Sequence, residues 1–199
     1  MKRACGILMH ITSLPSRFGV GTLGQEAYDF VDFLSAAGQT YWQMLPVTPT
    51  GFADSPYQSS STYAGNPYLI DLDRLIEQGL LTEAECGADW GDDPTRVDYG
   101  KLWEHRYEVL RKAFARFNRS EMTGFAAKNA WWLDTYALFC AVKTHFNGMP
   151  WYEWPDPAIQ DRTPEAIQQY SELLHDEIDF QKFMQYAFAM QWESLRRYA

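Results

Sequence analysis

The chain has 199 residues, of which 46% are hydrophobic and 22% are charged, so it can build a folded core and is not a disordered chain. Its 17 basic and 26 acidic residues give a formal net charge of −9, which argues against binding to the backbone of a nucleic acid. Three widely spaced cysteines point away from a disulfide framework, so we expect a cytoplasmic protein, and no apolar run of about 18 residues predicts a membrane span.

The first part of the chain predicts a strand, a helix and a second strand. Residues 6–12 are a short apolar run that reads as a buried strand. Residues 25–37 carry apolar side chains at helical spacing and stop at Gly38, a typical C-terminal cap. Residues 40–47 form a second strand-like run. Two strands joined by one helix within this length are expected to be parallel neighbours.

Between the first strand and the helix, Gly19, Gly21 and Gly24 have the spacing of a dinucleotide-binding fingerprint. In that fingerprint the glycines follow the strand directly, whereas here Pro15 and several loop residues intervene. The acidic partner expected about 20 residues further on is missing from residues 39–47. We therefore regard nucleotide binding as the weaker interpretation of this loop.

The second strand is followed by a long loop, GFADSPYQSSSTYAGNPY, at residues 51–68. Disordered linkers are poor in aromatic residues, whereas this loop contains Tyr57, Tyr63 and Tyr68, so we expect it to be ordered. It leaves the carboxyl end of a strand, where parallel α/β proteins bind ligands. Its single charge, Asp54, and its many hydroxyl groups suit a neutral polyhydroxylated ligand. The 16% aromatic content of the chain fits either a large aromatic core or a carbohydrate-binding surface.

The rest of the chain predicts helices and looks like a helical insertion into an interrupted domain, as in the N-terminal part of a longer protein. The apolar stretch 131–142 is expected to be buried all round. The sequence predicts this division: 1–50, a βαβ unit; 51–70, a cleft loop; 71–175, a helical insertion; 176–199, a final helix. The expected helical segments are 71–80, a capped turn at 82–85, 98–117, 121–146, a helix from Thr163 onward, and 176–199.

The spacing of residues alone identifies no catalytic pair. His10 lies near the end of the first strand, where a packed or capping role is the preferred interpretation. Asp54 and Glu153 lie in loops, but nothing places them as the paired carboxylates that glycoside chemistry uses. The sequence has neither a metal-binding motif nor a G-x-S-x-G motif, and we expect no metal and no cofactor.

Several stretches of the chain form a recognisable set: GILMHITSLPSRFGVGTLG, YWQMLPVTPTGFADSPYQSSSTYAGNPYLIDLDRL, RVDYG, WYEWP and QWESLRRYA. Together these stretches resemble the 4-α-glucanotransferases, also called amylomaltases or disproportionating enzymes. The resemblance implies an α/β fold: a (β/α)₈ TIM barrel, here represented by its first two strands, with an inserted, mainly helical subdomain. It also implies retaining transfer of α-1,4-glucan segments between maltooligosaccharides or to glucose, without cofactor. The family's catalytic carboxylates lie on later strands, so we expect the 199-residue chain alone to be inactive.

The resemblance also implies roles for residues of the long loop. Ser55 and Tyr57 match positions that line the family's sugar-binding cleft, and Asp54 lies beside them. Phe52 and Tyr99 match an aromatic pair of a second glucan-binding site, with Phe52 where a member of the family has Tyr. Phenylalanine keeps the stacking face of that residue and loses its hydroxyl.

Two further hypotheses remain beside the transferase. The chain could be a non-catalytic module that holds α-glucans through its aromatic residues, or part of an α-amylase-like hydrolase in which water accepts the glycosyl group. Its partners would be maltooligosaccharides and α-1,4-glucans, not nucleic acid or membranes. An open sheet edge would pair with the remainder of the same polypeptide or with a second copy.

Overall fold

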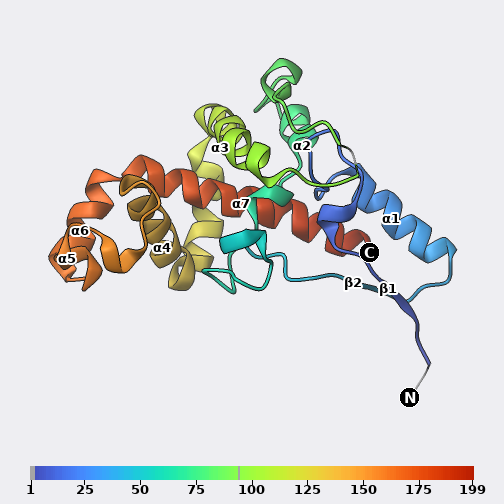
Figure 1. Cartoon of the computed structure of the whole chain (residues 1–199), viewed down its shortest axis with the longest axis horizontal. Helices are drawn as coiled ribbons and strands as arrows, with labels where there is room; N and C mark the ends of the chain where they lie inside the picture. The colour runs from blue at the N-terminus through green and yellow to red at the C-terminus, as the bar shows by residue number, and fades with distance from the viewer. Residues whose placement is uncertain (1–2, 94) are drawn as a thin grey trace. The chain divides into compact units, whose positions relative to one another are not determined.

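The computed structural model describes residues 3–93 and 95–199, without the side chain of Phe52. The chain packs as two units. Unit 1 comprises the described residues up to Phe117 together with Ala187–Ala199, and unit 2 comprises Asn118–Tyr186. The strands and α-helices (Figure 1) are β1 (Gly6–Leu8), α1 (Gln25–Ala36), β2 (Tyr41–Gln43), α2 (Leu72–Glu77), α3 (Tyr99–Arg116), α4 (Thr123–His145), α5 (Pro157–Gln160), α6 (Pro164–Leu173) and α7 (His175–Tyr198).

The βαβ unit predicted for the N-terminal part is confirmed. Strand β1 pairs in parallel with β2, with Ile7 opposite Trp42, and α1 connects them. Both strands are shorter than predicted, because the chain turns into a 3-10 helix at Ile11–Ser13 after β1 and leaves the extended pairing after β2. Apolar side chains of the pair are exposed, with Leu8 at 59% and Tyr41 at 65%.

The glycine-rich segment packs against the protein's own chain. A Cβ at Gly21 would overlap the carbonyl oxygen of Ile11, and one at Gly24 would overlap the carboxylate of Asp71. That carboxylate accepts a hydrogen bond from Thr22 Oγ1 at 2.6 Å and lies at the N-terminus of α1, where a dinucleotide would place its pyrophosphate. The glycines therefore serve close packing, which removes the basis for a nucleotide site here.

The core of unit 1 surrounds a buried arginine. Arg106 of α3 is fully buried and donates from Nη2 to the carbonyl oxygen of Tyr68 at 2.6 Å. Its guanidinium lies 5.6 Å from the ring centroid of Trp90. Gln191, near the end of α7, accepts from the backbone N–H of Asp71 at 2.7 Å and donates to its carbonyl oxygen at 3.1 Å. The end of α7 therefore completes this core.

Unit 2 is helical and has its own apolar core. The buried core residues are Val142, Trp154, Ile159, Ala166 and Tyr170. The composition of α4 suggested a helix buried all round, and this prediction is wrong. Trp131 is 67% exposed. The buried residues of α4 follow one face of the helix: Leu133, Ala137, Ala141 and Val142.

The boundaries of the two units differ from those of the segments 71–175 and 176–199 into which the sequence was divided. Helix α3 belongs to unit 1, where Arg116 pairs with Glu85 at 2.8 Å. The final helix α7 contributes to both units, because its residues from Ala187 onward pack with the N-terminal part of the chain. Such long-range packing has no signal in a local pattern. Among the described residues, no helix has the length and apolar character to cross a membrane.

Candidate functional site

The loop that follows β2 begins with a strained turn. Ala53 and Asp54 adopt left-handed backbone conformations, with φ of 57° and 55°. Each costs roughly 1 kcal/mol or more for a residue that is not glycine, and surrounding structure must hold it in place. Here the backbone N–H of Asp54 donates to Gly51 O at 3.2 Å, and that of Gln58 donates to Ser55 O at 3.2 Å. The turn is therefore closed by its own backbone.

Serine hydroxyls hold the rest of the loop. Ser55 Oγ accepts from the backbone N–H of Tyr57 at 3.3 Å. Ser61 Oγ accepts from the backbone N–H groups of Tyr63 and Ala64, each at 3.2 Å. The loop ends at Asn66, whose N–H donates to Val47 O at 2.9 Å. These bonds explain why a serine-rich segment of this length is ordered.

The three residues predicted to line a sugar cleft lie in one turn. Tyr57 is 71% exposed, while Asp54 and Ser55 are half-buried. Glu153 is exposed and belongs to unit 2, whereas this turn belongs to unit 1. The Phe52 side chain, predicted to pair with Tyr99, lies outside the part of the chain that is described.

An aromatic row on α3 lies near the same turn. Tyr99, Trp103 and Tyr107 are spaced four residues apart, so they share one face of the helix. The Tyr68 ring lies 6.3 Å from that of Tyr99 and 6.0 Å from that of Tyr107, and Trp103 lies 6.1 Å from Tyr107. Trp103 is 71% exposed. The sequence analysis did not identify Trp103, although the i, i+4 spacing of aromatic residues was a usable signal.

The Asp54 carboxylate acts electrostatically on this row. Burial, and then the Asp54 charge, raise the pKa of Tyr68 to about 12. The same two causes raise the pKa of Tyr99. Both phenols therefore stay protonated and can donate hydrogen bonds at neutral pH. The loop turn and the α3 row together present aromatic faces and hydroxyl groups.

The raised pKa of Tyr68 predicts a loss of stability at alkaline pH. The unfolded phenol titrates near pH 10, so its contribution is complete below pH 10 and is lost as the pH rises toward 12. The rise of the pKa from 10 to about 12 corresponds to about 3 kcal/mol of unfolding free energy. Urea unfolding between pH 9 and 11.5 should show a smaller decline for Tyr68→Phe than for the wild type. Equal declines would contradict the assignment to Tyr68.

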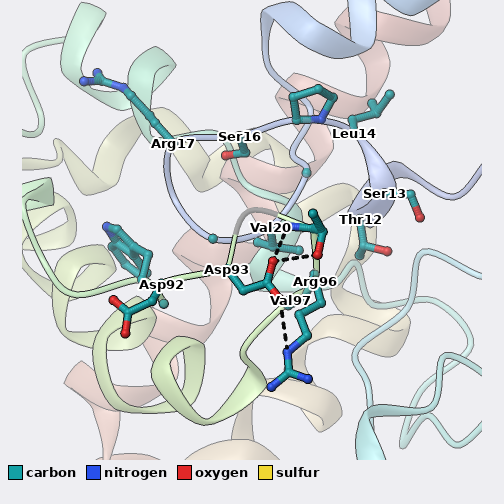
Figure 2. A pocket seen from close by; sticks show the side chains of 16 residues that line it. Thr12, Ser13, Leu14, Ser16, Arg17, Val20, Asp92, Asp93, Arg96 and Val97 are labelled. Atoms are coloured by element: carbon teal, nitrogen blue, oxygen red, sulfur yellow. Dashed lines mark hydrogen bonds and ion pairs between the residues drawn. The ribbon is translucent and has the colours of Figure 1, made fainter.

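A polar pocket lies elsewhere in unit 1 (Figure 2). Its volume is about 520 Å³, and it is lined by residues 12–17, 19–21, 90–93 and 95–97. Asp93 accepts hydrogen bonds from Thr95 Oγ1 at 2.6 Å and from the Thr95 N–H at 2.9 Å, and Arg96 Nε lies 3.8 Å from its carboxylate. The size suits a small polar molecule. Gly19 and Gly21 of the glycine-rich segment line this pocket, but none of the residues predicted to bind sugar does, and its walls come from segments about 75 residues apart.

Metal-binding groups do not gather in the described part of the chain: no three His, Cys, Asp or Glu side chains there could hold an ion together. His10 is half-buried, and burial lowers the pKa of its imidazole. Its position before the 3-10 helix Ile11–Ser13 is compatible with the packed role preferred above.

The comparisons with known proteins agree with one another. A family model described as 4-alpha-glucanotransferase matches residues 9–199. The 4-alpha-glucanotransferase of Streptococcus pneumoniae is 45% identical over all of this chain, and that of Thermus thermophilus is 44% identical over 98% of it. The chain spans about 40% of the length of these relatives.

Solved structures give the same result. The amylomaltase from Streptococcus agalactiae in complex with acarbose matches 99% of this chain with a TM-score of 0.94 and 44% identity, and 41% of that protein is covered. The amylomaltase from Corynebacterium glutamicum shares the fold, with a TM-score of 0.72 at 17% identity. The match covers 98% of this chain and 28% of the Corynebacterium chain.

Proposed function

Because the chain belongs to the 4-alpha-glucanotransferase family, we propose that the whole protein transfers α-1,4-glucan segments between maltooligosaccharides or to glucose. The family match over residues 9–199 is the observation that carries this proposal. The wider protein would be a (β/α)₈ barrel, of which β1 and β2 are the first two strands. The structural similarity to an amylomaltase in complex with acarbose supports an oligosaccharide ligand.

In this proposal the loop after β2 forms one wall of the glucan cleft. The exposed ring of Tyr57 offers a flat face to the apolar side of a glucose unit. Ser55 and Asp54 of the same turn, both half-buried, would offer polar groups to sugar hydroxyls. Because the turn is closed by its own hydrogen bonds, these groups are oriented before the ligand arrives.

The reaction itself would follow a retaining double displacement. A first carboxylate attacks the anomeric carbon as the glycosidic bond breaks, and a carboxylic acid protonates the leaving oxygen. The carboxylate left by that acid then takes the proton of the acceptor hydroxyl, whose oxygen displaces the first carboxylate from the anomeric carbon. We propose that these carboxylates lie outside this chain, on later strands. The described residues would then bind and orient the glucan.

A second glucan-binding surface is proposed at the α3 row. Tyr99 is part of the predicted Phe52–Tyr99 pair, and Trp103 extends the same helix face with a highly exposed ring. A row of rings at this spacing suits a chain of sugar units more than a single sugar. The half-buried Tyr99, held near Tyr68, would be its fixed end.

Incubating the full-length protein with maltotriose tests the proposed reaction. We expect glucose together with maltooligosaccharides longer than the substrate. Glucose and maltose without longer products would indicate an α-amylase-like hydrolase, and binding without any product would indicate the non-catalytic module. The isolated 199-residue chain is expected to release no glucose, and release by a pure sample would contradict the placement of the carboxylates.

A further inference from the structure

Unit 2 displays two large aromatic side chains side by side on a short 3-10 helix, Trp151–Glu153. Trp151 is 54% exposed and Tyr152 is 63% exposed. Their ring centroids lie 5.9 Å apart and their planes are inclined at 83°. We call these two residues the aromatic corner. They belong neither to the loop after β2 nor to the α3 row, both of which are parts of unit 1.

The backbone beneath the aromatic corner is held firmly. Trp154 is buried in the core of unit 2, and its Nε1–H donates to Met149 O at 3.1 Å. Gln160 donates from Nε2 to Trp154 O at 2.6 Å and to Tyr152 O at 3.4 Å. These hydrogen bonds hold the backbone on both sides of the corner. A ligand that stacks on the two rings would therefore cause little further loss of backbone conformational entropy.

The chemistry of the corner favours a neutral ligand with both apolar and hydroxyl-bearing faces. Its own charged side chain is Glu153, which is exposed and would repel an anionic ligand. Tyrosine and tryptophan each combine an apolar face with a polar hydrogen-bonding group. Two rings at a steep angle suit a curved chain, and α-1,4 linkages curve a glucan so that successive glucose units turn their faces in different directions.

We propose that the aromatic corner is a docking site for α-1,4-glucan chains, built from other residues than the cleft loop and the α3 row. This inference rests on the proposed function, because it takes the substrate polymer as the occupant. The site would hold a long glucan while another part of that chain reacts. It would leave short substrates unaffected, since these fill only the cleft.

Affinity electrophoresis of the full-length protein in gels containing glycogen tests the site. We expect Trp151→Ala/Tyr152→Ala to raise the apparent Kd for glycogen about tenfold, the size expected for the loss of an aromatic anchor. Trp131→Ala, which removes a 67% exposed ring from α4, is the control and should bind glycogen as the wild type does. Wild-type affinity in the double variant would overturn the proposal.

A second measurement needs no variant. Oxidation of exposed tryptophans by N-bromosuccinimide, mapped by mass spectrometry, should be slowed by glycogen at Trp151 and not at Trp131. Absence of protection at Trp151 would overturn the proposal, and so would a corner already closed to the reagent, because another part of the protein would then cover it.

Maltotriose turnover in the same samples separates this proposal from the proposed function. The double variant should convert maltotriose at the wild-type rate. A wild-type protein that leaves maltotriose unchanged would contradict the transferase, whereas the glycogen affinities would still decide the docking site.

Discussion

Replacing Gly21 with alanine is expected to destabilise unit 1 by at least about 3 kcal/mol, at the upper end of the cost of overpacking a core. A Cβ at this buried position would overlap Ile11 O and lie 2.8 Å from Leu14 O and 2.9 Å from Leu14 N. These are backbone atoms of the turn that follows β1, so no side chain can move aside to make room. Thermal unfolding and urea unfolding of the full-length protein would measure the loss.

Gly124→Ala is the matched control for that variant. Gly124 lies in the first turn of α4, and apart from its chain neighbours and the backbone of its own helix, no described atom lies within 4 Å of an added Cβ. Alanine favours a helix over glycine, so this variant should equal the wild type or exceed its stability by up to about 1 kcal/mol. A Gly21→Ala variant as stable as the wild type would contradict the packing described for the glycine-rich segment.

Replacing Tyr57 with alanine is expected to lower kcat/KM for maltotriose transfer by the full-length protein about 10- to 100-fold. That corresponds to about 1.4 to 2.7 kcal/mol of lost transition-state stabilisation. The ring is 71% exposed, so its removal should change the free energy of unfolding by no more than about 0.5 kcal/mol. Transfer kinetics and a melting curve measured on the same sample would separate the two effects.

Tyr57→Phe refines the same experiment. It retains the flat face and removes the hydroxyl, so it should keep most of the transfer activity if stacking dominates. Normal kinetics in a folded Tyr57→Ala variant would remove Tyr57 from the cleft. A melting temperature lowered together with activity would instead assign the residue a structural role.

Features governed by neighbouring residues were predictable from the sequence. The capping box of Thr82 and Glu85 and the cap of α6 by Thr163 are both present. Gly38 and Gly79 adopt the left-handed conformation expected just after a helix. Each of these features depends on residues within one or two helical turns, and a local pattern contains all the information that it needs.

Contacts between distant segments were not predictable in the same way. Asp71 was expected only near the start of a short helix, yet its carboxylate also bonds Thr22 and its backbone bonds Gln191, 120 residues away. The pocket of Figure 2 likewise needs two segments whose sequences give no sign of each other. The sequence predicted the loop that contains the candidate cleft turn, and the residues in it. The closeness of this turn to Tyr99 depends on how α3 packs.

The bonds between Asp71 and Gln191 have a consequence for how the protein is made. Unit 1 includes Ala187–Ala199, and a Cβ at Gly65 would collide with the Phe188 ring, so the N-terminal segment packs directly on the end of α7. During synthesis this end leaves the ribosome only after all of Asn118–Tyr186 has emerged. Unit 2 is continuous in sequence, so it can fold during synthesis before unit 1 is complete, because unit 1 also needs Ala187–Ala199 at the end of α7.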